Sequence, residues 1–122
     1  MDTLKVICDK HQLLLIEDCA EAFGTYYKGR HVGTFGDIAT FSFFGNKTIT
    51  TGEGEMVVTQ DKELMAKACH LKSQGVSTTT EYWHDVLGFN YRMTNICAAI
   101  GLAQLEQADD ILAKKKTNCA MV

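Results

Sequence analysis

Residues 38–55 read IATFSFFGNKTITTGEGE, and this stretch decides the fold class that the sequence predicts. Ile38–Phe44 alternates as a β-strand does, so Phe41 and Phe43 share one face of the predicted strand. A Gly-Asn turn ends the strand and places Lys47 directly after it. The polar, glycine-rich segment that follows is too flexible and too polar for a core, and it predicts a loop between two strands.

A second strand is predicted upstream. Leu13–Ile16 is an apolar run without polar alternation, which indicates that both of its faces are covered, as in a parallel or mixed sheet between helices. Glu17 and Asp18 end this run. Before the run, a short helical pattern is expected to begin with Asp2 or Thr3 as its N-cap.

The rest of the chain continues to alternate between strand and helix. The patterns predict, in order, a hairpin in the glycine-rich stretch 24–36, a strand at 56–58, a helix capped by Asp61 and ended by Gly75, an exposed loop at 76–82, and one long helix that Thr94 caps and that runs past Ile111 to the lysines at 114–116. This alternation indicates an α/β class.

The composition excludes several function classes. With 122 residues, 46% hydrophobic and 22% charged, the chain suits one globular domain with a modest core. The formal net charge is -3, and the only like-charge run is at 114–116, so no nucleic-acid partner and no membrane-surface partner is predicted. No apolar run reaches membrane-spanning length, so we expect an unexported protein without a membrane partner.

The cysteines and histidines point to no disulfide framework and no metal. The five cysteines at positions 8, 19, 69, 97 and 119 form no CxxC pair, and their spacing favours a reducing cytoplasm. The four histidines have no ligand spacing with acids or cysteines. The sequence therefore predicts a cytoplasmic protein without a metal site.

Two predicted strands end in groups that suit an aldehyde cofactor. Asp18 follows one strand and Lys47 follows the next, and ligands of open α/β sheets lie beyond the carboxyl ends of strands. An amine can bind an aldehyde covalently, and a carboxylate can hold a basic ring nitrogen protonated. On spacing alone the pair also fits a turn or a surface ion pair, so both interpretations stay open.

Three segments, in this order, resemble the DegT/StrS family of pyridoxal-phosphate-dependent sugar aminotransferases: IEDCAEAFG at 16–24, VGTFGDIATFSFFGNKTITTGEGEMVVT at 32–59 and LGFNYRMTNICAAIGLAQLE at 87–106. The resemblance implies part of the large domain of the aspartate-aminotransferase-like fold (fold type I), with a mixed sheet flanked by helices. It implies that residues 1–122 are the central part of the domain that binds pyridoxal 5'-phosphate, without the family's N-terminal portion and small domain.

The resemblance also implies roles for four residues near the predicted strand ends. Lys47 matches the Schiff-base lysine, which also moves the proton during amino transfer, and Asp18 matches the acid that pairs with the pyridine nitrogen. Ser42 matches a serine that contacts the cofactor phosphate, and Glu21 stands where the family places a side chain against the cofactor ring. The other interpretations are an exposed lysine, a helix cap, a buried strand serine and a surface glutamate.

Two further residues match positions that are farther along the family pattern. Asn90 matches an asparagine that reaches across a dimer interface to the cofactor phosphate of the partner, so its use implies a homodimer. His84, within the YWHD string, is a candidate contact for the sugar nucleotide. The alternatives are a loop-capping role for Asn90 and packing of His84 beside Trp83.

The implied activity is transfer of an amino group from glutamate to a nucleotide-linked 4-keto-6-deoxy sugar, for surface polysaccharide or O-antigen synthesis. A sugar dehydratase of the same family is disfavoured, because those members look to replace the lysine at 47 with histidine. An aminotransferase for another nucleotide keto-sugar, or an inactive remnant, stays open.

Two departures from the family pattern favour the remnant. The family usually has glycine at the position of Glu55, which predicts backbone strain if that position needs positive φ. The stretch 117–122 loses the resemblance after Lys116, as a frameshift or an early stop would cause.

Overall fold

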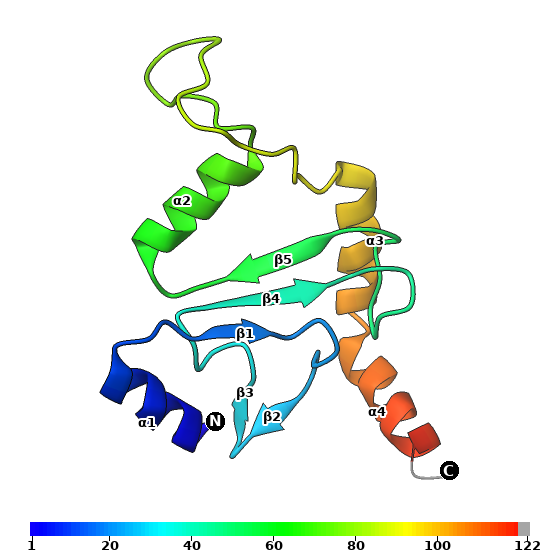
Figure 1. The fold of residues 1–122 in the computed structure, drawn as a ribbon. Helices are drawn as coiled ribbons and strands as arrows, with labels where there is room; N and C mark the ends of the chain where they lie inside the picture. The colour runs from blue at the N-terminus through cyan, green and yellow to red at the C-terminus, as the bar shows by residue number, and fades with distance from the viewer. Residues whose placement is uncertain (120–122) are drawn as a thin grey trace.

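The computed structural model describes residues 1–119, and Figure 1 shows a central sheet with helices at both ends of its strands. The elements in chain order are α1 (Asp2–His11), β1 (Ile16–Asp18), β2 (Tyr26–Tyr27), β3 (Arg30–His31), β4 (Ile38–Ser42), β5 (Glu55–Val58), α2 (Lys62–Lys72), α3 (Asn95–Leu105) and α4 (Ala108–Cys119). The predicted loss of resemblance after Lys116 falls partly on residues 120–122, which lie outside the described residues.

The sheet is mixed, as predicted. Its order is β1-β4-β5, with β1 parallel to β4 and β4 antiparallel to β5. A separate antiparallel pair, β2 and β3, is the hairpin that the glycine-rich stretch predicts. In Figure 1, α1 and α2 lie where β4 begins, whereas α3 and α4 lie where it ends.

The two faces of the sheet differ in what covers them. Phe41 and Phe43 line an apolar cavity of about 360 Å³ together with residues of α3, which confirms that these two rings share a face. Ala39 on the same face is 1% exposed. On the opposite face, Ile16 and Val57 are exposed, so the described residues leave that face largely open.

The first strand and the first helix depart from the prediction. β1 is Ile16–Asp18, later than the predicted Leu13–Ile16, because Leu13 still donates to the Cys8 carbonyl at the end of α1. Leu14 is 76% exposed, so the expectation that both faces of the run are covered is wrong for the described residues. Asp2 and Thr3 lie inside α1 and do not cap it; the cap position is Met1.

The second half of the chain follows the prediction except in two places, one of which is the end of α2 at Lys72, before the predicted stop at Gly75. Asp61 caps α2 by accepting from the N–H groups of Glu63 and Leu64, and Thr94 caps α3. The single long helix predicted after Thr94 is wrong, because the chain turns between Leu105 and Ala108. The turn brings α4 against the candidate site, where Lys115 donates to the hydroxyl of Thr48.

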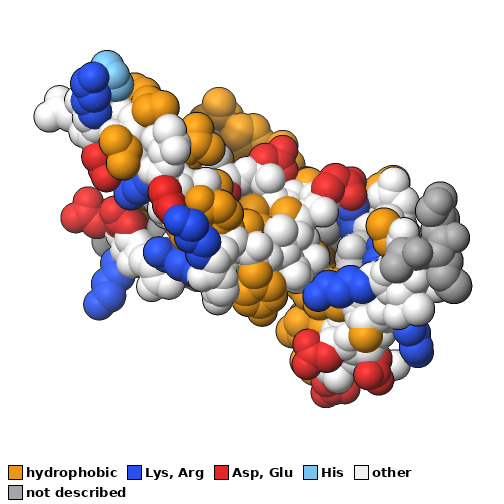
Figure 2. Space-filling model, turned by 90° about the horizontal axis from the view of Figure 1, so that it is seen from below, with side chains coloured by type: hydrophobic (Ala, Val, Ile, Leu, Met, Phe, Trp, Pro, Cys, Tyr) orange, Lys and Arg blue, Asp and Glu red, His pale blue; other side chains and the backbone are white. Residues whose placement is uncertain are grey.

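Apolar side chains remain exposed around Asn90 and along α3. The helix is apolar on most sides, and a helix of this kind is normally covered all round. The exposed members are Leu87, Phe89, Tyr91, Ile96, Ile100, Leu102 and Leu105. Figure 2 likewise shows apolar side chains at the surface between charged groups, on the face seen from below.

Candidate active site

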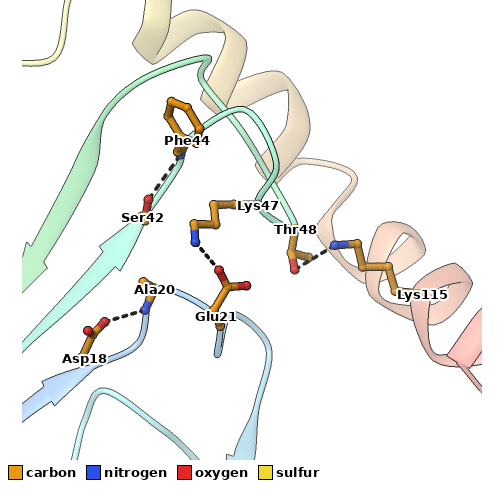
Figure 3. Close-up of polar contacts among 8 residues, drawn as sticks. All are labelled: Asp18, Ala20, Glu21, Ser42, Phe44, Lys47, Thr48 and Lys115. Atoms are coloured by element: carbon orange, nitrogen blue, oxygen red, sulfur yellow. Dashed lines mark hydrogen bonds and ion pairs between the residues drawn. The ribbon is translucent and has the colours of Figure 1, made fainter.

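The carboxyl ends of β1 and β4 lie side by side because the two strands are parallel neighbours. Asp18 is the register partner of Thr40, and Ser42 lies two residues farther along β4, so Asp18 and Ser42 share one face of the sheet. Lys47 follows on the loop after β4. Figure 3 shows the three side chains around one space, together with Glu21 from the segment after β1.

Lys47 points back toward β1 and not into solvent. Its side chain is 17% exposed, and its ammonium forms an ion pair with the carboxylate of Glu21, whose side chain is 79% exposed. The side chains of Lys47 and Asp18 are predicted to have only solvent between them in a site without cofactor, and this stays a prediction; the partner of the amine in the structure is Glu21. Glu21 lies against the amine because the segment after β1 carries it toward the loop after β4.

The loop that holds Lys47 is fixed by hydrogen bonds. Lys47 N–H donates to the Phe44 carbonyl (3.0 Å), and Thr51 N–H donates to the Phe43 carbonyl (2.9 Å). Ile49 and Thr51 are each 4% exposed, so the prediction that this segment is too polar for a core is wrong at these two positions. The hydroxyl of Thr51 donates to the Glu53 carbonyl (2.5 Å), so the polar groups of this side chain are satisfied locally, which makes its burial possible.

A side chain of α3 fastens the same loop. Gln104 accepts from the N–H of Thr50 (2.9 Å) and donates to its carbonyl (2.7 Å). These two bonds join residues that are far apart in sequence. A polar residue within an apolar helix is the one feature of the sequence that points to this pair.

Asp18 has an oxygen available for a ligand. Its Oδ1 accepts from the N–H of Ala20 at 3.0 Å, and its Oδ2 makes no hydrogen bond with the described residues. Ser42 accepts from the N–H of Phe44 at 3.3 Å through its Oγ, which leaves the hydroxyl proton available. The site therefore offers an amine, an acceptor oxygen and a hydroxyl donor.

This set of groups fits pyridoxal phosphate. The amine suits the aldehyde, the free carboxylate oxygen suits a protonated ring nitrogen, and the hydroxyl suits a phosphate oxygen. Each group is supplied by a different segment at one edge of the sheet. The residues present therefore match the chemistry of the cofactor.

Asn90 and His84 lie outside this group. Asn90 pairs with Ser73 in an isolated bridge and lines a second cavity of about 930 Å³, with residues of β5, α2 and α3. His84 is exposed, and its Nδ1 lies 2.8 Å from the carbonyl of Gln74. The structure thus does not bring either residue to Lys47 within the chain.

Glu55 shows no backbone strain. It is the first residue of β5, where it pairs with Ser42. The non-glycine residues with positive φ are Gln12, Lys28, Gln74 and Tyr82. The structure therefore does not support the prediction of backbone strain at Glu55.

Glu17 is the residue that the sequence analysis missed. It is 8% exposed, and its carboxylate accepts from backbone N–H groups of the loop before β4. Next to it, burial raises the pKa of the Cys19 thiol, and the negative charges of Glu17 and Asp18 raise it further. The only signal in the sequence was an acidic residue at the end of an apolar run.

A family model of known proteins matches the chain from end to end. It is the model of the DegT/DnrJ/EryC1/StrS aminotransferase family, and it covers residues 1–122. This chain belongs to the DegT/DnrJ/EryC1/StrS aminotransferase family. The resemblance that the three sequence segments indicated is thereby confirmed, and with it the fold class.

Individual family members agree with this assignment. The GDP-perosamine synthases of Escherichia coli O157:H7 and Vibrio cholerae are 65% and 58% identical to this chain over 116 residues, which are 95% of the chain. Within the family, the FFGNKTITTGEG string at 43–54 and the YWHD string at 82–85 favour these synthases, and the identities confirm this resemblance. The chain spans 32% of the length of each.

A solved structure supports the fold. The aminotransferase from Psychrobacter cryohalolentis superimposes with a TM-score of 0.82 at 42% identity, over 89% of this chain and 30% of that chain.

Within residues 1–119 of this chain, no helix is long and apolar enough to cross a membrane. The same residues contain no group of three or more His, Cys, Asp or Glu side chains placed to hold a metal ion.

Proposed function

We propose that this chain is the cofactor-binding part of an enzyme that transfers an amino group from glutamate to a nucleotide-linked 4-keto-6-deoxy sugar, with pyridoxal 5'-phosphate as cofactor. The observation that carries the proposal is that Asp18, at the carboxyl end of β1, and Lys47, on the loop after the parallel strand β4, lie at the same edge of the sheet around one space. The names of the two GDP-perosamine synthases support a sugar linked to guanosine diphosphate as the substrate. The proposed role of the product is in O-antigen synthesis.

When bound, pyridoxal phosphate supplies an aldehyde that takes up amino groups and a ring that accepts electrons. Lys47 would hold this cofactor through its amine and would move the proton at the reacting carbon of the substrate. Asp18 would keep the ring nitrogen protonated through Oδ2, which makes no hydrogen bond with the described residues. The hydroxyl of Ser42 would donate a hydrogen bond to the phosphate.

Glu21 has a double role in this proposal. In the structure its carboxylate pairs with the amine of Lys47. Because covalent capture of the cofactor requires that amine, Glu21 would have to leave it and would then lie against the cofactor ring. Its high exposure makes such a movement inexpensive, because an exposed ion pair contributes little stability.

We also propose that the enzyme is a homodimer in a reducing compartment such as the cytoplasm. The exposed apolar residues around Asn90 and on α3 support an interface there, which the second copy of the chain would cover. Asn90 would then reach the cofactor phosphate of a partner, and His84 the sugar nucleotide. The five cysteines carry free thiols, which supports the reducing compartment.

A substrate assay tests the activity. The natural protein that contains this sequence is incubated with pyridoxal phosphate, glutamate and a GDP-linked or UDP-linked 4-keto-6-deoxy sugar, and mass spectrometry follows the amino sugar product. We expect product from the GDP-linked sugar and little from the UDP-linked one. Cofactor binding without product from either sugar would favour the inactive remnant.

A further inference from the structure

The carboxylate of Glu17 is buried beside the candidate acid but on the opposite face of β1. Glu17 is 8% exposed, and it is the register partner of Ala39, whereas Asp18 is the partner of Thr40. A buried carboxylate is costly unless its oxygens are hydrogen-bonded. The bonds that Glu17 makes therefore matter more than those of an exposed acid.

Glu17 binds the backbone of the loop that leads into β4. Its Oε1 accepts from the N–H groups of Phe35 and Gly36, both at 2.6 Å, and its Oε2 accepts from that of Gly33 at 2.7 Å. Hydrogen bonds to an ionised acceptor are about twice as strong as neutral ones. One side chain thus binds three residues of the loop 33–36.

The end of the same loop is also held, by two hydrogen bonds between Asp37 and Leu15, the residue before β1. Asp37 N–H donates to the Leu15 carbonyl (2.9 Å), and Leu15 N–H donates to the Asp37 carboxylate (2.7 Å). Gly36 lies so close to the residue before β1 that a Cβ atom at position 36 would be 2.4 Å from the Leu15 oxygen. The loop therefore runs along β1 in close contact, with the carboxylate of Glu17 as its central attachment.

The strand that carries Asp18 has few other attachments. β1 has three residues and lies at the edge of the described sheet, where its ladder pairs with β4 alone. The bond that follows Asp18, from Cys19 N–H to the Thr40 carbonyl (2.8 Å), lies at the end of this short ladder. Loss of the loop attachment would let the carboxyl end of β1 shift, and Asp18 with it.

We propose that Glu17 is a positioning residue that fixes Asp18 for its contact with the cofactor ring. Glu17 does not touch the ligand space, because its side chain lies on the covered face of the sheet. It acts through the backbone of β1, which it ties to the loop 33–36. The effect on cofactor binding rests on the proposed function, whereas the effect on the position of Asp18 does not.

The first test follows backbone amides in the protein without cofactor. Glu17→Gln keeps the size of the side chain but replaces one acceptor oxygen with an NH2 group, so at least one loop N–H faces a donor. We expect amide hydrogen exchange to become about 10- to 100-fold faster at Gly33 if the NH2 group replaces Oε2, or at Phe35 and Gly36 if it replaces Oε1. Amide exchange at Cys19 should become faster in the same variant. Faster exchange in the loop with no change at Cys19 would overturn the proposal.

The second test is a double-mutant cycle on the dissociation constant of pyridoxal phosphate, measured in a Lys47→Arg protein so that covalent capture is absent. If Glu17 acts through Asp18, Glu17→Gln weakens binding several-fold when Asp18 is present and little in the Asp18→Asn protein. Equal weakening in both backgrounds would show a merely structural role and overturn the proposal.

Two controls separate the possible failures. Cys8→Ala removes a buried side chain in α1, away from the site, and we expect it to lower stability without changing the dissociation constant. If neither the Lys47→Arg variant nor the wild-type protein binds pyridoxal phosphate, the proposed function is wrong. The amide exchange at Cys19 then still decides whether Glu17 positions Asp18.

Discussion

The amine of Lys47 and the carboxylate of Glu21 form an ion pair across the carboxyl ends of β1 and β4. Lys47 is largely covered and Glu21 is largely exposed, so the acid is the partner that can move. In the proposed enzyme this pair competes with the cofactor for the amine. The competition gives a measurable prediction.

Glu21→Gln removes the charge that holds the amine, so pyridoxal phosphate should capture Lys47 faster. An exposed ion pair contributes up to about 1 kcal/mol, which corresponds to an increase of up to about fivefold in the capture rate. Stopped-flow absorbance measures the rate. Glu81→Gln, in the exposed loop 76–82, is the control and should leave the rate unchanged; a slower capture in Glu21→Gln would contradict the competition.

Gln104→Ala should destabilise the protein through the loop that carries Lys47. The change leaves the N–H and the carbonyl of Thr50 without their partner, which costs about 1–3 kcal/mol. Urea unfolding measures the loss. Gln107→Ala is the matched control, because the exposed side chain of Gln107 donates to the Ala103 carbonyl within the same helical segment. The loss of stability in this variant should stay within about 0.5 kcal/mol.

Gly36→Ala should destabilise much more than Gly45→Ala. A Cβ at position 36 would lie 2.4 Å from the Leu15 oxygen, and relief of that contact costs about 1–3 kcal/mol or more. A Cβ at position 45 would meet its nearest atom, the Gly52 oxygen, at 3.9 Å. Thermal unfolding of the two variants checks this order, and equal melting temperatures would show that the loop 33–36 can move away from β1.

Cys19 should react slowly with thiol reagents. Burial and then the charges of Glu17 and Asp18 raise the pKa of its thiol above the ordinary value of 9.0, so less thiolate is present at any pH below that pKa. Iodoacetamide labelling followed by peptide mass spectrometry should modify the exposed Cys69 first at pH 8. The labelling rate of Cys19 should still increase above pH 9; rapid labelling of Cys19 at pH 8 would contradict its burial.

The sequence predicted the parts of the fold that depend on local patterns. The strand at Ile38, the cap at Asp61 and the cap at Thr94 follow from alternation and from capping chemistry, and each is present. The start of β1 was misplaced because the apolar run at Leu13 does not show where the helix before it ends. The break before Ala108 was missed because it depends on contacts of α4 with distant segments.

For the site, the sequence predicted candidate residues but not their relations. Lys47, Asp18 and Ser42 were recognised from the family pattern, and the parallel register places them at one edge. The pairing of Lys47 with Glu21 depends on the path of the segment after β1, which no local pattern fixes. The role of Glu17 depends on backbone groups sixteen to nineteen residues away, so it was visible only in the structure.

Covalent capture of pyridoxal phosphate by Lys47 tests the central claim most directly. The protein is incubated with the cofactor, reduced with borohydride and digested, and the modified peptide is identified by mass. We expect one stable adduct, on Lys47, and none in Lys47→Arg, which keeps the charge but lacks the primary amine. An adduct spread over the surface lysines, or one retained at another site in Lys47→Arg, would contradict the account.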